Sequence, residues 1–508
     1  MLGPTRGVIP CRRQGDPQEF LVGHNQVALD LQSGLFLSPG RDVTSAPWQM
    51  RSRQGAQVLF EGAPNHEEGA EENVETGHER LAGAAVAGTG RMSEHGLNHD
   101  LKADVRVSLV GTQFEAKIGK VAHGGHFVTR HDGRVVFVRH ALPGERVRVQ
   151  ITDGREGDRF LLGDAIHVFE PSQHRVAAGC PYAGPGNCGG CDWQHSELSY
   201  QRELKAAVIT EQFQRLAHMD VGVQVEALPG DPQGFRWRTR TEFAIDSSGV
   251  AGLHRHHSRD IIAVQDCLIS TEAVIATGVL GRRWPMASSV DVVDASGEPH
   301  AVMVPLPSAD STIPQVSERV DTGDWSAEFR LSARGFWQVH PHAAATFVAH
   351  VRQELAAQPG ERALDLYAGV GLFALALADA VGPTGAVLAI ESDARAMADA
   401  KSNLRLRPEI ELRRGKVDRS LKPLVRQGIR TDLVVLDPPR TGAGRAVIKG
   451  IAALAPRAVA YVACDPAALA RDVAYARDLG YGMRSLRAFD AFPNTHHVEC
   501  IAILEPLT

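Results

Sequence analysis

The sequence from about residue 336 onward alternates apolar stretches with alanine-rich stretches, and this alternation restricts the fold more than any other feature. The apolar stretches RALDLY, AVLAIE, TDLVVLD and RAVAYVA are short and nearly continuous, as buried parallel strands are. The stretches between them, such as GLFALALADAV and DARAMADAKSNLRL, favour helices. The pattern predicts a doubly wound α/β sheet over 336–508, in which ligands bind at the carboxyl ends of the strands.

The remaining sequence divides into three further segments. Residues 1–104 are acidic and poor in large apolar groups, which predicts a disordered extension. Residues 105–170 predict a small, OB-like β-barrel, because Val147 and Val149 alternate with arginines and Asp132-Gly133 marks a hairpin turn. Residues 171–335 predict a β-rich domain with a cysteine cluster and a helix over 196–218 that packs on the C-terminal domain.

Composition places the chain among ordinary globular proteins. It has 43% hydrophobic residues, a net charge of −6 and seven cysteines. No apolar stretch approaches the ~20 residues of a membrane span, and the N-terminus lacks the pattern of a secretory signal. The few, clustered cysteines suit a reducing compartment. The sequence therefore predicts a cytoplasmic protein with no membrane partner and no obligate protein partner.

A glycine turn follows the first strand of the C-terminal domain. In LDLYAGVGLF, Gly369 and Gly371 allow a tight turn and a close approach of a ligand to the next helix. The spacing is neither that of a dinucleotide fold nor that of a P-loop. Glu391 ends the next strand and could bind ribose hydroxyls, while Asp365 could hold the loop or an amino group. This pattern is typical of S-adenosylmethionine enzymes; a glycine turn without a nucleotide is the alternative.

The strand-like stretch TDLVVLD runs into LDPPR. The two prolines stiffen the loop and expose Asp437 beside the predicted cofactor. Amino-group methyltransferases usually have an aromatic residue after the prolines, and Arg440 stands there instead. An amino-methyltransferase is therefore the weaker interpretation, and Arg440 could bind a phosphate or the substrate base.

Two groups of cysteines could carry chemistry. Cys464 follows the strand RAVAYVA and could be a buried thiol, a metal ligand or a nucleophile. A second group combines CPYAGPGNCGGCDWQH with a distant cysteine in VQDCLIS and contains Cys180, Cys188, Cys191 and Cys267. Four thiolates suit zinc or an iron–sulfur cluster, and spacing alone slightly favours zinc. The pair in CGGC could also be redox-active, but no thioredoxin-like context follows.

Five motifs occur in a fixed order: GFWQVHPHAAATF, LDLYAGVGLF, LDPPRTGAG, VACDPAALARD and FDAFPNTHHVECIAIL. Together they resemble the class I S-adenosylmethionine-dependent RNA uracil-5-methyltransferases, which make 5-methyluridine in ribosomal and transfer RNA. The resemblance covers about residues 105–508. It implies that the barrel is a TRAM domain, an RNA-binding module, and that the partner is a structured RNA.

The resemblance also implies roles for individual residues. Gln338, Tyr367, Glu391 and Asp437 would contact the cofactor, Cys464 would be the nucleophile and Glu499 the base. The four-cysteine set would hold a [4Fe–4S] cluster. The favoured substrate is ribosomal RNA, specifically 23S. The alternatives are uridine 54 of transfer RNA and a non-catalytic iron–sulfur RNA-binding protein.

Four features depart from the family pattern. His340 and Asp465 replace asparagines, and Asn494 replaces a histidine. The first gap in the cysteine set is also longer than usual. A carboxylate at Asp465 would disfavour the neighbouring thiolate unless it points away or pairs with Arg471.

The central domain contains an alternating run of basic residues. In GFRWRTRTEF, Arg236, Arg238 and Arg240 flank Trp237, and Arg255 and Arg259 follow in the next basic segment. Basic residues interleaved with an aromatic ring predict a phosphate track with a stacked, extruded base. A solvated arginine face is the alternative.

Overall fold

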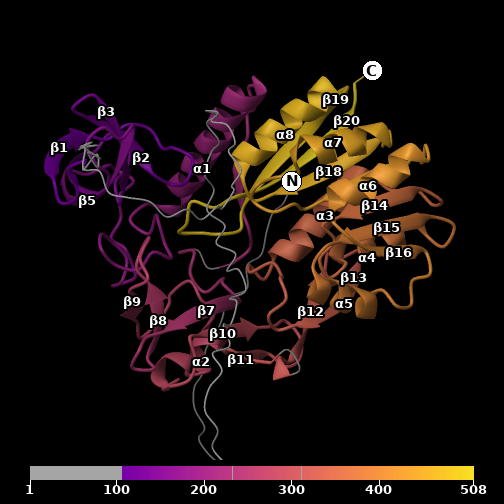
Figure 1. The fold of residues 1–508 in the computed structure, drawn as a ribbon, viewed down its shortest axis with the longest axis horizontal. Helices are drawn as coiled ribbons and strands as arrows, with labels where there is room; N and C mark the ends of the chain where they lie inside the picture. The colour runs from indigo at the N-terminus through magenta and orange to yellow at the C-terminus, as the bar shows by residue number, and fades with distance from the viewer. Residues whose placement is uncertain (1–105, 231–232, 310–311, 508) are drawn as a thin grey trace, which may run out of the picture. The chain divides into compact units, whose positions relative to one another are not determined.

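The computed structural model of this protein describes residues 106–230, 233–309 and 312–507, so the predicted extension over 1–104 lies outside the described residues. The largest sheet has the strand order β16-β15-β14-β17-β18-β20-β19-β6 (Figure 1). Its strands are β6 (Val225–Ala227), β14 (Arg362–Leu366), β15 (Ala386–Glu391), β16 (Ile410–Arg414), β17 (Leu433–Leu436), β18 (Ala458–Ala463), β19 (Tyr481–Asp490) and β20 (Glu499–Pro506).

The predicted parallel sheet is confirmed for β14 to β18, whereas β20 is antiparallel to both of its neighbours. This reversal decides where one predicted site residue lies. Because β20 runs the other way, its first residue, Glu499, lies at the edge where the parallel strands end. Ala463 pairs with Cys500, so Cys464 and Glu499 occupy neighbouring strand ends.

Helices cover both faces of this sheet, as its nearly continuous apolar strands require. One face packs against α3 (Ala343–Leu355) and α4 (Leu372–Val381), with α5 (Ala394–Asn403) beside them. The other packs against α6 (Val417–Arg426), α7 (Gly444–Ala453) and α8 (Pro466–Asp478), which lie side by side in Figure 1. The second face also receives α1 (Leu198–Gln212) and the π-helical turns Phe213–Ala217, through Ile209 and Phe213.

A separate five-stranded sheet has the order β1-β4-β5-β3-β2, and β1 also contacts β2. Its strands are β1 (Gln113–Lys117), β2 (Phe127–His131), β3 (Arg134–Arg139), β4 (Arg146–Asp153) and β5 (Phe160–Glu170). The predicted hairpin is confirmed, since Asp132 and Gly133 turn with φ of 49° and 76° between β2 and β3. The predicted alternation is confirmed in β4, where Val147 and Val149 are buried and Arg146 is exposed.

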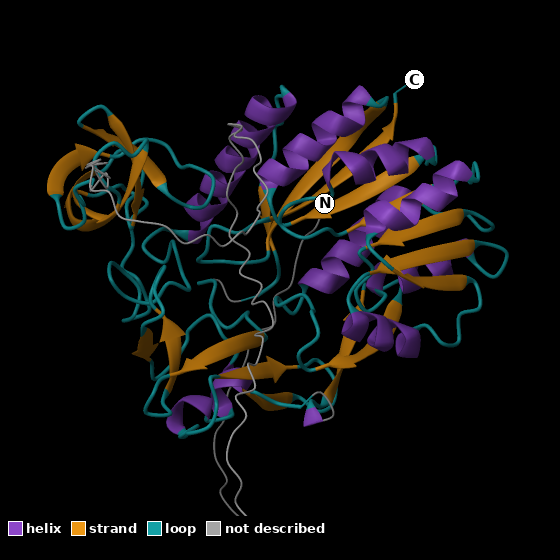
Figure 2. Ribbon diagram, in the orientation of Figure 1, coloured by secondary structure: helices purple, strands orange, loops and turns teal. Residues whose placement is uncertain are grey.

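The central region is also β-rich, with short elements joined by long loops (Figure 2). One sheet has the order β11-β10-β7-β8-β9, and a separate hairpin joins β12 to β13. Phe329 and Leu331 of that hairpin enter the core cluster that contains α3 and α4. The elements are β7 (Arg240–Ile245), β8 (Ala251–His254), β9 (Ile261–Ala263), α2 (Glu272–Ala276), the 3₁₀ turn Val279–Gly281, β10 (Ser289–Asp294), β11 (Ala301–Leu306), β12 (Gln315–Asp321) and β13 (Ser326–Ser332).

Among the described residues, no helix combines the length and apolar character needed to span a lipid bilayer.

Candidate active site and cysteine pocket

The glycine turn lies between β14 and α4. Gly371 caps α4 with φ of 93°, and a Cβ there would lie 2.8 Å from Leu404 Cδ1, so only glycine fits. The Gly369 N–H donates to Glu391 Oε2 at 2.9 Å, so the end of β15 holds the turn. Tyr367 also has a left-handed φ, 64°, a strained conformation that is common at functional sites.

Two carboxyl groups end adjacent strands at this turn. Asp365 belongs to β14 and is 1% exposed, and Asp437 directly follows β17. After β14, the chain adds β15 and β16 on one side of that strand and then adds β17 on its other side. Ligands bind at such a point in doubly wound sheets. Burial raises the pKa of Asp365 to about 8 and that of Asp437 to about 7. Such a site favours a ligand that brings positive charge.

The structure brings Cys464 and Glu499 together with this group. Cys464 lies in the turn between β18 and α8, and Glu499 is 5% exposed at the start of β20. Burial, the charge of Glu499 and that of Asp437 raise the pKa of the Cys464 thiol to about 12. Burial and Asp437 also raise the pKa of Glu499 well above its usual value.

Arg440 opposes these raised pKa values. Its guanidinium lowers the pKa of both Cys464 and Glu499, and its Nη2 lies 3.4 Å from His497 Nε2. The Arg440 loop is fixed to α8, because the N–H groups of Ala443 and Gly444 donate to buried Asp472 at 2.8 and 3.0 Å. Arg440 therefore supplies a positive charge that acts on Cys464 and Glu499 from a loop fixed to α8.

A small cavity of about 170 Å³ adjoins the thiol, and its walls come from distant segments. Sequence reasoning missed most of these residues because no local pattern marks them. One is Lys205 of α1, whose fully buried Nζ donates to Asp490 at 2.5 Å and to the Phe492 carbonyl at 3.1 Å. The lining residues include His123, Gly124, Gly125, Trp193, Lys205, Arg440, Cys464, Asp465, His496 and His497.

Asp465 does not pair with Arg471, so that expectation is wrong. Asp465 caps α8 by accepting from the Ala468 N–H at 2.7 Å, and its other oxygen lies 2.8 Å from His123 Nε2. Arg471 instead donates to Asp472 and to the Thr441 carbonyl. These bonds lower the pKa of Asp465, and its charge raises the pKa of Cys464 less than those of Glu499 and Asp437 do.

Gln338 lies in the turn before α3 and is partly exposed. Within the described ranges, its side chain forms no hydrogen bond to the acidic group. Its neighbours are fixed, since the Val339 carbonyl accepts from Thr239 and buried His340 stacks on Trp237. The role of Gln338 in cofactor binding therefore stays a prediction.

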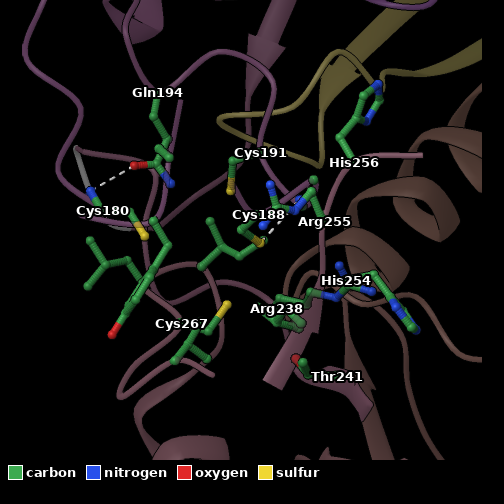
Figure 3. A pocket seen from close by; sticks show the side chains of 18 of the residues that line it. Cys180, Cys188, Cys191, Gln194, Arg238, Thr241, His254, Arg255, His256 and Cys267 are labelled. Atoms are coloured by element: carbon green, nitrogen blue, oxygen red, sulfur yellow. Dashed lines mark hydrogen bonds between the residues drawn. The ribbon is translucent and has the colours of Figure 1, made fainter. Parts of the chain in front are cut away.

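The other four cysteines of interest line one cavity of about 370 Å³ (Figure 3). The sulfur atoms of Cys180, Cys188, Cys191 and Cys267 surround a common space in that view. The loop is shaped by hydrogen bonds from the Cys180 N–H to Gln194 Oε1 at 3.0 Å and from the Gly190 N–H to Cys188 Sγ at 3.4 Å. A Cβ at Gly189 would lie 2.8 Å from His256 Cα, so the loop packs closely on the neighbouring segment.

The spacing of these side chains bears on the two metal interpretations. In the part of the chain that the structure describes, no three cysteine, histidine, aspartate or glutamate side chains converge as a single ion requires. One zinc ion with Zn–S bonds of about 2.3 Å would need its sulfurs within roughly 4 Å of one another. Neither the zinc nor the iron–sulfur interpretation is therefore demonstrated.

The predicted arginine track is largely occupied by internal partners. Arg236 forms two bonds to Asp266, at 2.9 and 2.7 Å, and Arg240 donates to buried Glu318 at 2.7 Å. Trp237 is only 4% exposed, so the expectation that it stacks on an extruded base is wrong. Burial of this strand was not visible in its alternating sequence.

Comparison with known proteins agrees with this geometry. The TRAM domain matches residues 107–166, and the tRNA (uracil-5-)-methyltransferase family matches residues 313–506. An uncharacterised RNA methyltransferase of Streptomyces coelicolor is 47% identical over 438 residues, which cover 79% of this chain and 94% of that protein. The chain belongs to the RNA uracil-5-methyltransferase family. It is an S-adenosylmethionine-dependent RNA methyltransferase.

Other relatives extend this comparison. An uncharacterised RNA methyltransferase of Bifidobacterium longum is 36% identical over 421 residues, covering 77% of this chain and 96% of that protein. The solved Pyrococcus abyssi tRNA (uracil-54, C5)-methyltransferase in complex with S-adenosyl-L-homocysteine has a TM-score of 0.55 and 21% identity. That match covers 77% of this chain and all of the other, and it shows a shared fold. The methyltransferase therefore combines a TRAM barrel with the α/β sheet of this family.

Proposed function

We propose that this methyltransferase transfers a methyl group to C5 of a uridine in RNA. The observation that carries the proposal is the pairing of β18 with β20, which places Cys464 and Glu499 at neighbouring strand ends. A cavity for part of the substrate adjoins the thiol. The buried acids Asp365 and Asp437 favour the positive charge of the cofactor. Together with Glu391, Tyr367, Gln338 and the Gly369–Gly371 turn, these acids form the proposed cofactor site.

Uracil C5 is too weak a nucleophile to take a methyl group directly. In the proposed reaction, the Cys464 thiol gives its proton to solvent water and the thiolate sulfur bonds to C6. The C5=C6 π bond breaks in this addition, and its electron pair makes C5 nucleophilic. S-adenosylmethionine supplies an electrophilic methyl group on a positively charged sulfur. Arg440 favours the thiolate, because its positive charge lowers the pKa of Cys464.

Glu499 is the proposed base for the second half of the reaction. It removes the C5 proton, the C5=C6 double bond re-forms, and Cys464 leaves as a thiolate. Within the described residues, no donor hydrogen-bonds to the Glu499 carboxyl group, so this group is not committed to a structural contact. Its raised pKa makes the ionised form a stronger base than an ordinary glutamate.

The test uses RNA carrying 5-fluorouridine, in which fluorine replaces the proton that the base must remove. We expect a covalent complex with the wild-type protein and none with Cys464→Ser, which should also lose methyl transfer by at least about 1,000-fold. Cys500→Ser is the matched control, since that thiol is fully buried in β20. Methyl transfer by Cys464→Ser, or product on adenine or guanine, would refute the proposal. RNA binding without any transfer would instead support a non-catalytic RNA-binding protein.

We further propose ribosomal RNA as the substrate, with uridine 54 of transfer RNA as the alternative. The support is the combination of the TRAM barrel and the four-cysteine cavity, which is an argument by analogy. Total RNA from cells that lack the gene, treated with the protein and labelled cofactor, would identify the modified molecule. Label in the 23S fraction is expected, and label only in transfer RNA would overturn this assignment.

For the cysteine cavity we propose a [4Fe–4S] cluster. Each thiolate of such a cluster ligates a different iron, which suits four sulfurs that surround one cavity. Methyl transfer from this cofactor needs no redox step, so the proposed role is structural. Protein purified without oxygen should be brown and contain iron and sulfide, and Cys188→Ser should lose both. A colourless protein containing zinc would refute the cluster.

A further inference from the structure

The loop between β1 and β2 brings the TRAM barrel to the nucleophile. His123 of this loop and Asp465, the residue after Cys464, are separated by 342 positions in sequence, yet His123 Nε2 lies 2.8 Å from Asp465 Oδ2. An ionised carboxylate can only accept, so Nε2 carries the proton in this hydrogen bond. Both residues line the cavity beside the Cys464 thiol.

This barrel loop is held firmly in place. The Trp193 indole donates to the Gly125 carbonyl at 3.0 Å, and Lys120 pairs with Glu211 of α1 at 2.5 Å. A Cβ at Gly125 would lie 2.5 Å from His496 Cβ, so the loop is closely packed against the segment before β20. The contact between His123 and Asp465 is therefore one of several that fix the loop in the site.

Asp465 is also the position where this chain has a carboxylate instead of the amide of the family pattern. A negative charge next to the thiol opposes formation of the thiolate. Here one oxygen is bonded to the helix N–H of Ala468 and the other to His123. The carboxylate of Asp465 therefore has a donor from the barrel, His123, in addition to the Ala468 N–H of its own helix. These two partners share its negative charge.

We propose that His123 is a positioning residue of the active site. Its hydrogen bond to Asp465 links the barrel to the loop that carries Cys464 and holds that loop in place. The barrel then has a second task besides binding RNA, because it completes the wall of the nucleophile's cavity. This inference rests on the proposed role of Cys464 as nucleophile. Glu499, Asp437 and Arg440 are the other charged groups that act on that thiol.

The test measures alkylation of Cys464 by iodoacetamide at one alkaline pH in the full-length protein, with the modified peptide quantified by mass spectrometry. We expect His123→Ala to slow alkylation about 5-fold, because Asp465 loses a partner. In the Asp465→Asn background the same change should alter the rate less than about 2-fold, because the charge is gone. His123→Gln, which keeps a donor, should retain at least half of the wild-type rate. His167→Ala, an exposed barrel histidine, is the matched control.

Steady-state kinetics give an independent readout. His123→Ala should lower kcat while the KM for RNA changes less than about 2-fold. A raised KM with unchanged kcat would show that the loop only binds RNA and would overturn the inference, as would equal effects of His123→Ala in both backgrounds. Because alkylation needs no turnover, these results are distinct from failure of the nucleophile proposal, which the serine variant of Cys464 tests.

Discussion

At the scale of single residues, the site is a group of acids whose ionisation is disfavoured by burial, and the charge of Asp437 adds to this at the other three. Asp365, Asp437, Glu499 and the Cys464 thiol all have raised pKa values, and burial is the largest cause for each. The positive charge of Arg440 opposes the increase in the pKa of Cys464 and of Glu499. These raised pKa values favour the neutral thiol of Cys464, so the proposed reaction begins by removing that proton.

This electrostatic environment predicts the pH dependence of thiol reactivity. The reactive form is the thiolate, and its pKa of about 12 lies above the ordinary value. The alkylation rate of Cys464 should therefore rise with pH without reaching a plateau below about pH 10. Iodoacetamide kinetics between neutral and alkaline pH, followed on the Cys464 peptide, check this. A plateau near neutral pH would contradict the raised pKa.

Replacing Glu499 by glutamine should separate the two halves of the reaction. The amide cannot accept the C5 proton, so the C5=C6 bond cannot re-form and Cys464 cannot leave. Turnover should fall by at least about 100-fold, while a covalent complex with ordinary RNA accumulates. Gel separation under denaturing conditions measures that complex. Glu505→Gln, at the exposed end of β20, is the control. Unchanged turnover would exclude Glu499 as the base.

At the scale of elements, the loop between β19 and β20 connects the active site to three other segments. Asn494 is 3% exposed and exchanges hydrogen bonds with the Gln201 side chain of α1, at 3.1 and 2.8 Å. Its Nδ2 donates to the Gly234 carbonyl at 2.8 Å, and its own carbonyl accepts from Asp192 and Trp193 of the cysteine segment. The Asn494 amide thus both accepts and donates at this position.

Replacing Asn494 by alanine should therefore weaken this junction. The change takes the Nδ2 donor away from the buried Gly234 carbonyl and removes one of the three hydrogen bonds that Gln201 Nε2 donates. The cost should be about 1–3 kcal/mol of unfolding free energy. The midpoint of urea unfolding should fall, and methyl transfer should fall with it because Glu499 follows this loop. Gln173→Ala, at an exposed position, is the matched control and should change neither. An unchanged midpoint would show that the loop is held without Asn494.

At the scale of the whole molecule, the barrel shares its core with residues outside the barrel. Trp193, Leu204 and Val208, which lie outside the barrel strands, are buried in the same cluster as Phe127 and Val149. The indole of Trp193 also donates to the Gly125 carbonyl. The barrel and the α1 segment are thus expected to fold as one unit.

This sharing of one core predicts the behaviour of fragments. Residues 106–170 expressed alone should lack a cooperative thermal transition, because the apolar side chains that cover their core are missing. Extension of the fragment to residue 218 should restore a transition. Calorimetry of the two fragments makes the comparison. A cooperative transition in the shorter fragment would show that the barrel is autonomous.

Local sequence pattern determined most of the elements of this protein, whereas the proposed roles of its reactive groups came from the family resemblance. Apolar runs, glycine turns and alternation depend on neighbours within a few residues. The strands β14, β15, β17 and β18, the Asp132-Gly133 hairpin and the positions of Cys464 and Asp437 at strand ends were predictable for this reason.

Only the tertiary structure decided which of these groups meet. The antiparallel return of β20 put Glu499 beside Cys464, and packing between distant segments brought His123 and Lys205 to the same cavity. Internal carboxylates, rather than RNA, occupy Arg236 and Arg240. These pairings depend on burial and charge between segments that lie far apart in the chain, and no local pattern in the sequence records them.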